Sequence, residues 1–112
     1  MKIPDDSIIP FEKLSRYLLV ARVRNDKSKY LAQAGFTNKN PEALLEAIRF
    51  LCGTVEAVGQ KTSEYGTFYR VEGELLGVNG VNIPVIAVWL ERKTDRKFQF
   101  ITLVPGKEHH EA

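Results

Sequence analysis

The sequence predicts an α+β domain in which two to three N-terminal helices pack on one face of a four-stranded antiparallel β-meander. Apolar residues recur at helical spacing in the first half of the chain, whereas the second half alternates apolar and polar residues with the period of a strand. The pair Asn79-Gly80, a strong hairpin signal, separates two of the strand-like segments.

The segment SIIPFEKLSRYLL is predicted to form the first helix. Ser7 is a candidate N-cap, and Pro10 suits the first turn because its φ angle is already close to helical. Apolar side chains then follow at helical spacing and are expected on one shared face: Leu14, Tyr17 and Leu18.

Two further helices are predicted before the strands begin. In DKSKYLAQAGF, Asp26 is a candidate N-cap and Gly35 a candidate C-terminal stop. NPEALLEAIRFLCG is the clearest helix, with Asn40 as cap, Pro41 at the first position and Gly53 at the end. Its apolar stripe consists of Leu44, Leu45, Ile48, Leu51 and Cys52.

Four segments of the second half are predicted to be strands: TVEAVGQKT, GTFYRVEGELLG, VNIPVIAVWLE and KFQFITLVP. The second alternates, as a strand with one solvated side does. The third is apolar on both sides and is predicted to be central, with Pro84 near its start. In the last strand the period of two places one set of side chains together: Phe98, Phe100, Thr102 and Val104.

Composition limits the classes of function. A chain of 112 residues with 44% apolar and 27% charged residues is typical of one globular domain, predicted over residues 1–108 with a polar tail at 109–112. The start MKIPDDSIIP has acidic residues and prolines where a signal peptide needs an apolar run, and no segment approaches the roughly 20 apolar residues of a membrane span. We therefore predict a cytoplasmic protein without a membrane segment.

No cofactor or metal is predicted. Cys52 is the single cysteine, which excludes an internal disulfide and a multi-cysteine metal cluster, and its place on an apolar helix face predicts a buried filler. The only histidines, His109 and His110, lie in the polar tail, which argues against histidine-based acid–base chemistry and zinc sites.

Positive charge is concentrated in the segment RVRNDKSK, which leads into the predicted second helix. A basic loop before a helix can bind phosphate through side-chain charge and free backbone N–H groups. This makes Arg22, Arg24 and Lys27 candidate substrate-binding residues. Lys29 is the last residue of the same segment and lies in the predicted second helix. The alternative is a solvated connector, since charge runs commonly lie on the surface.

A second candidate group lies on the solvated side of the strand GTFYRVEGELLG. Arg70 beside Glu72 and Glu74 offers carboxylates for proton transfer and a cation for phosphate. Alternating charge on an exposed strand is equally what solubility alone favours, and both interpretations stay open.

An ordered set of short motifs extends over nearly the whole chain, from about residue 8 to residue 105. It comprises Tyr17-Leu18-Leu19, Ser28-Lys29, Gly35-Phe36, Pro41-Glu42, GTFYRVEGELLGVNG, Val88-Trp89, Thr102 and Pro105. In this order they resemble an uncharacterised bacterial domain family, frequent in cyanobacteria. Its members occur as short stand-alone proteins and as C-terminal domains of polymorphic toxins.

That family is in turn similar to toxin ribonucleases of the barnase, colicin and RelE-like group, whose N-terminal helices pack on a four-stranded antiparallel sheet. The resemblance implies metal-independent RNA cleavage, in which cations stabilise the crowded phosphate while a base and an acid move protons. It also implies a small cognate partner of the antitoxin kind.

Carried over by position, Lys29 matches the family's helix lysine and Thr102 the threonine of its closing Thr-Ala-Tyr-Pro motif. Here that motif is Thr-Leu-Val-Pro, so Val104 replaces a tyrosine. The leading hypothesis is a toxin-like endoribonuclease with Lys29 and Thr102 as catalytic residues and Arg70 and Glu72 as their partners. The alternative is a non-catalytic domain that binds a protein or RNA, which the altered motif favours.

Overall fold

The computed structural model describes residues 1–21, 23 and 27–106. Several sequence predictions fall outside the described residues: those for Arg22, Arg24, Asp26, His109, His110 and the tail at 109–112.

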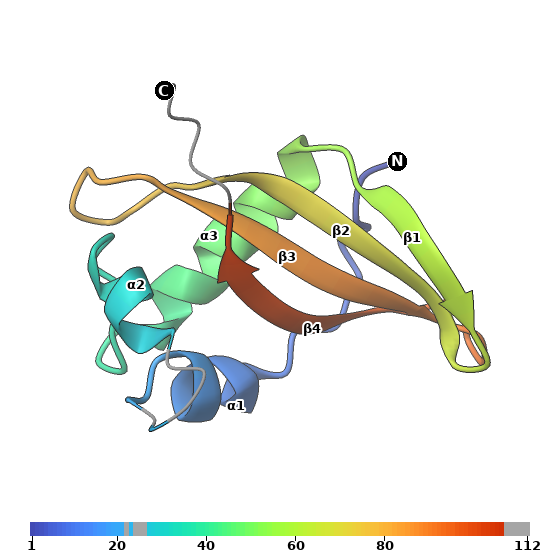
Figure 1. Cartoon of the computed structure of the whole chain (residues 1–112), viewed down its shortest axis with the longest axis horizontal. Coiled ribbons are helices and arrows are strands. Elements are labelled where there is room, and N and C mark those ends of the chain that lie inside the picture. Colours follow the sequence, from blue (N-terminus) through green and yellow to red (C-terminus); the bar gives the residue numbers. More distant parts are fainter. Residues whose placement is uncertain (22, 24–26, 107–112) are drawn as a thin grey trace.

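Helical segments come first along the chain and a sheet follows (Figure 1). The elements are α1 (Phe11–Lys13), the π-helical segment η1 (Leu14–Leu18), α2 (Ser28–Ala32), α3 (Pro41–Thr54), β1 (Val58–Ser63), β2 (Gly66–Leu75), β3 (Ile83–Arg92) and β4 (Phe98–Pro105). The strand order is β1-β2-β3-β4, and each neighbouring pair is antiparallel. The predicted α+β class with a four-stranded meander is therefore confirmed. No described helix is long and apolar enough to span a bilayer.

The first helix differs from the prediction because it widens into a π-helical turn. The backbone N–H of Leu19 donates to the carbonyl of Leu14 at an N···O distance of 3.0 Å, a spacing of five residues instead of four. The wider turn buries Leu14, Leu18 and Leu19 and leaves Tyr17 56% exposed. The expected shared face of Leu14, Tyr17 and Leu18 is wrong for Tyr17, since it assumed the regular 3.6-residue period.

The segment before α1 covers part of the outer edge of β4. Ile8 pairs in parallel with this strand: its N–H donates to the carbonyl of Phe98, and its carbonyl accepts from the N–H of Phe100, both at 2.8 Å. Ser7 does not cap α1, as the sequence had suggested. It is buried, and its Oγ accepts a hydrogen bond from Nη1 of Arg49 at 3.1 Å. The backbone carbonyl of Phe98 and the N–H of Phe100, which β4 would otherwise expose at the edge of the sheet, thereby gain hydrogen-bond partners.

The ends of α2 and α3 largely follow their predicted signals. Gly35 adopts a φ of 87°, and the N–H of Phe36 donates back to the carbonyl of Leu31 at 3.2 Å, which closes the end of α2. Asn40 precedes Pro41 as expected, but its side-chain oxygen accepts from the N–H of Thr37 at 2.8 Å instead of capping α3. Gly53 lies inside α3, which continues to Thr54.

One face of the sheet carries the hydrophobic core. Its buried side chains come from β2, β3 and β4 and pack against Leu44, Ile48 and Leu51 of α3. They are Val71, Leu75, Ile83, Val85, Ala87, Trp89, Phe98, Phe100 and Leu103. Figure 1 views the sheet from its other face, with α3 lying behind it. No described helix lies over this second face, which we call the open face.

Cys52 is a buried filler, as its place on α3 had indicated. The indole Nε1 of Trp89 donates to its sulfur at 3.3 Å, and burial raises the pKa of the thiol to about 11. The opposing effects of the Trp89 hydrogen bond and of the Arg49 charge are smaller.

We expect the Cys52 thiol to be almost unreactive toward an aromatic disulfide reagent at pH 8 in the native protein and fully reactive in urea, because the thiolate is the nucleophile. As the pH rises from 9.0 to about 11, the unfolded thiol ionises before the native one. The unfolded state then binds fewer protons, so the free energy of unfolding should fall across this window. Rapid labelling of the native protein would contradict this picture.

Candidate functional site

A β-bulge in β4 organises the site. Phe100 pairs with Trp89 of β3, whereas Thr102 pairs with the preceding residue, Val88, so Ile101 is an extra residue in β4. The extra residue reverses the alternation of side chains. Phe98, Phe100 and Leu103 are buried on the core face, and Thr102 shares the open face with Val88.

The sequence-based assignment of faces in β4 is therefore wrong beyond Phe100. It grouped Thr102 with Phe98 and Phe100, and the same period of two implies the opposite side of the strand for Leu103. A strict period of two holds only while each residue has one partner across the ladder, and the bulge breaks that condition.

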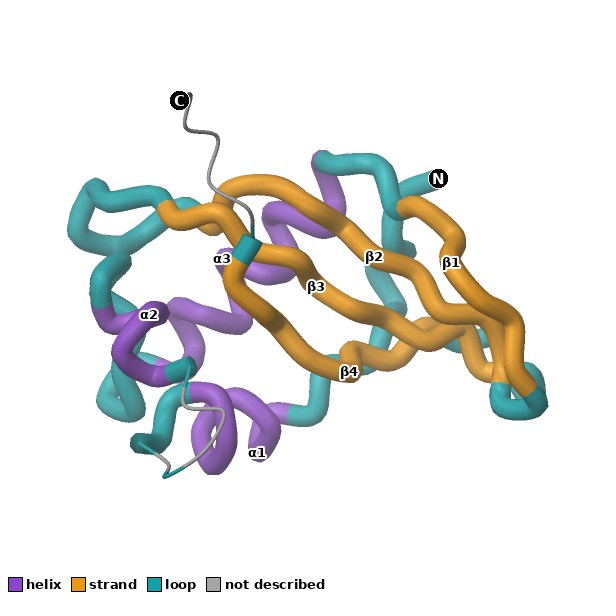
Figure 2. Tube along the Cα trace, viewed as in Figure 1, coloured by secondary structure: helices purple, strands orange, loops and turns teal. Residues whose placement is uncertain are grey.

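Two lysine side chains from the helical half reach this bulge. Nζ of Lys13, in α1, donates to the carbonyl oxygen of Ile101. Nζ of Lys27, directly before α2, donates to Oγ1 of Thr102 at 3.0 Å. Both contacts are partly buried, and in Figure 2 α1 and α2 lie beside the outer edge of β4. Two ammonium groups thus flank one bulged segment of an edge strand.

Arg70 lies in the same transverse row of the sheet as Thr102. Arg70 of β2 pairs with Val88 of β3, and Val88 pairs with Thr102 of β4. Neighbouring strands are about 4.8 Å apart, so these two positions are separated by roughly 10 Å across the open face. Nη2 of Arg70 donates to Oε1 of Glu72 at 2.8 Å, and the two side chains are 36% and 44% exposed.

The structure thus brings together four of the residues that the sequence singled out: Lys27, Arg70, Glu72 and Thr102. Lys29 is exposed on α2, and the lysine in contact with Thr102 is Lys27, two residues earlier. Lys13 was not predicted from the sequence, because its contact joins two residues 88 positions apart and depends on the bulge in β4. No local signal in the sequence marks that contact.

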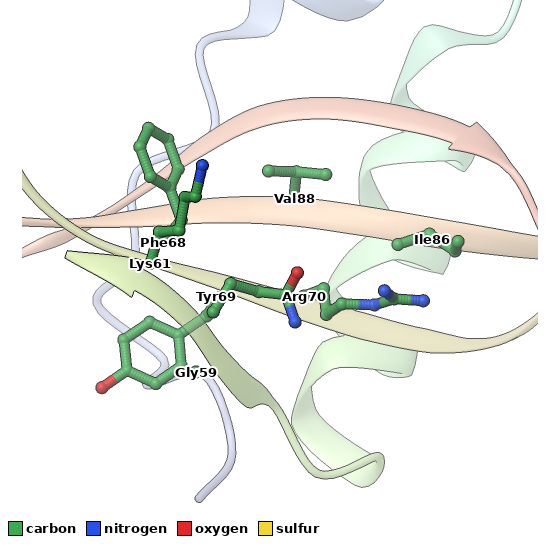
Figure 3. A pocket seen from close by; sticks show the side chains of 8 residues that line it. Gly59, Lys61, Phe68, Tyr69, Arg70, Ile86 and Val88 are labelled. Atoms are coloured by element: carbon green, nitrogen blue, oxygen red, sulfur yellow. The ribbon is translucent and has the colours of Figure 1, made fainter. Parts of the chain in front are cut away.

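The same face carries a hollow of about 530 Å³ between β1 and β2 (Figure 3). Its floor is formed in part by Phe68, Ile86 and Val88, and Arg70 and Lys61 also line it. Within the described residues, no group of three or more His, Cys, Asp or Glu side chains is arranged to hold a metal ion.

The fold and the site define a small α+β domain with cationic side chains beside one open sheet face. The chain belongs to the family described as domain of unknown function DUF6883, whose model matches residues 3–107. A comparison with curated proteins gives no match.

Among solved structures, the chain is similar to a chain of a contact-dependent growth inhibition toxin–immunity protein complex from Klebsiella pneumoniae 342. The two share 22% sequence identity with a TM-score of 0.68, over 88% of this chain and 99% of that one. At this level of identity the likeness establishes a shared fold.

Proposed function

We propose that this domain is a toxin-like, metal-independent endoribonuclease that acts on RNA in the cytoplasm. The observation that carries the proposal is the contact between Lys27 and Thr102 at the bulged edge of β4, in one row with Arg70. Phosphoryl transfer is catalysed mainly by positioning and by donors aimed at the charge that develops on the phosphate. An ammonium, a hydroxyl and a guanidinium around one stretch of open sheet supply such donors.

The roles follow from the chemistry of each side chain. A scissile phosphate would lie between Thr102, whose hydroxyl donates to a phosphate oxygen, and the guanidinium of Arg70. Glu72 would accept the proton of the ribose 2′-hydroxyl as that oxygen attacks phosphorus. The bond to the 5′-oxygen then breaks, and the Lys27 ammonium would protonate the leaving oxygen. Lys29 lies two residues after Lys27 and is exposed, and its positive charge would attract the RNA backbone.

A cognate inhibitory protein is part of the proposal. The structural neighbour belongs to a complex of a growth inhibition toxin with its immunity protein, which supports a toxin-related role for the shared fold. A partner seated on the open face would cover Arg70 and Thr102 together. We propose that a small antitoxin-like or immunity-like protein binds there.

The test is incubation of purified protein with total bacterial RNA in EDTA, read on a denaturing gel beside Thr102→Val. Valine keeps the branched shape of threonine and removes only the hydroxyl, so the fold should persist. We expect cleavage by the wild type and strongly reduced cleavage by Thr102→Val. Equal cleavage by both proteins would remove Thr102 from the site.

A second candidate function is a non-catalytic interaction domain. The observation in its favour is the half-buried apolar surface of the open face, to which Phe68, Ile86, Val88 and Leu90 contribute. The replacement of the family's tyrosine by Val104 points the same way. Intact RNA in every lane of the gel, with a stable protein complex isolated from cells, would favour this function over the nuclease.

A further inference from the structure

The hollow on the open face results from a bulge in β1. Gly59 pairs with Tyr69, but the next pair joins Thr62 to Thr67, so two residues of β1 oppose the single residue Phe68. These two residues are Gln60 and Lys61. Both bulge residues and Phe68, which they oppose, line the hollow.

The floor of the hollow is flat and apolar. The ring of Phe68 stands beside the side chain of Lys61, and Ile86 and Val88 continue the surface along β3 (Figure 3). Tyr69 points to the other side of the strand, where the centroid of its ring lies 5.3 Å from that of Phe98. Phe68 is only half-buried, so its ring remains available to a ligand.

The rim of the hollow is cationic and polar. Lys61 provides positive charge, Arg70 adds a guanidinium that is ion-paired with Glu72, and Gln60 provides an amide that can both donate and accept hydrogen bonds. The volume of about 530 Å³ lies within the range of roughly 300–1,000 Å³ typical of small-ligand sites. A ligand that matches this surface has a flat apolar face, polar edges and an attached anion.

We propose that the hollow binds an unpaired nucleobase of single-stranded RNA, with an adjacent phosphate of the same strand at Lys27 and Thr102. The row from Arg70 through Val88 to Thr102 connects the two places across roughly 10 Å of sheet. Base–aromatic stacking combined with a cationic path for the backbone is the general mode of single-strand binding. The inference rests on the proposed function and adds where the strand is held.

The experiment measures binding by fluorescence anisotropy with two labelled 2′-O-methyl oligonucleotides of six residues, which lack the nucleophilic hydroxyl. One carries bases, and the other is abasic at every position. We compare the wild type with Phe68→Leu, which removes the ring, and with the matched control Phe50→Leu. Phe50 lies on α3, away from the hollow, and is 57% exposed. Lys61→Gln tests the rim independently of the ring.

We expect Phe68→Leu to weaken binding of the base-bearing strand by roughly fivefold or more, as the loss of one stacking contact would. Binding of the abasic strand should not change, and Phe50→Leu should match the wild type for both strands. Lys61→Gln should weaken both strands by similar factors, since it removes a phosphate contact.

Equal effects of Phe68→Leu on both strands, or none on either, would overturn the proposal. If neither strand binds the wild type, the proposal is also overturned. The two proposals fail separately. Cleavage of ordinary RNA without base-dependent binding rejects only the hollow, and base-dependent binding without cleavage of any RNA rejects only the nuclease.

Discussion

Lys27→Ala is expected to reduce RNA cleavage by about 10²- to 10⁴-fold without loss of the fold, the range typical for the loss of one general acid. Nζ of Lys27 is the cation in contact with Thr102 Oγ1, at 3.0 Å. The alanine variant leaves the threonine hydroxyl in place with water as its new partner. The effect is measured from initial rates of cleavage of a labelled single-stranded RNA in EDTA. Circular dichroism checks that the variant is folded.

Two further variants make this test specific. Lys93→Ala removes an exposed lysine from the turn between β3 and β4 and is expected to cleave like the wild type. Lys29→Ala keeps the contact between Lys27 and Thr102, so its loss should be much smaller than that of Lys27→Ala. The reverse order, an active Lys27→Ala with an inactive Lys29→Ala, would transfer the catalytic role to Lys29.

Trp89→Ala is expected to destabilise the domain by about 3–5 kcal/mol, the usual cost of deleting a large buried aromatic side chain. Trp89 is fully buried on β3, its ring meets that of Phe100 edge-on at 5.5 Å, and its indole N–H is bonded to Cys52. This cost is a large fraction of the 5–15 kcal/mol that stabilises a typical domain.

Urea unfolding followed by circular dichroism measures the loss. Because Trp89→Ala is at risk of not folding, Trp89→Phe provides a milder variant that keeps a ring and loses the bond to Cys52, at a cost of roughly 1–2 kcal/mol. Leu76→Ala, at a side chain 46% exposed, is the control and should change stability by less than about 0.5 kcal/mol. If Trp89→Phe unfolded at a higher urea concentration than Leu76→Ala, Trp89 would not have the stabilising role that we assign to it.

Much of the fold was predictable because its signals are local. The central position of β3 followed from apolar residues on both of its faces, and Asn79-Gly80 marked the hairpin that precedes it, where Gly80 has a φ of 89°. Gly35 ended its helix as predicted, with a φ of 87°. Each of these features depends on a few neighbouring residues, which a sequence displays directly.

The site was only partly predictable because two bulges and a π-helical turn shape it. Arg70 and Glu72 lie on the face that alternation assigned to them. Thr102 reached that face only because Ile101 is an extra residue in β4. The contacts of Lys13 and Lys27 depend on how the helices dock against that strand. Bulges and docking follow from tertiary packing, which the period of a single segment does not encode.

The bulged segment of β4 affects the order in which the parts of the proposed site come together during protein synthesis. The two lysine contacts join residues 88 and 75 positions apart, so the helices are made long before the strand that they meet. A ribosome that has translated only as far as β3 carries every candidate cation of the site but neither Thr102 nor the bulge. The site that we propose for RNA cleavage therefore assembles only after β4 has left the ribosome, so under that proposal a chain still being synthesised could not cleave the message that encodes it.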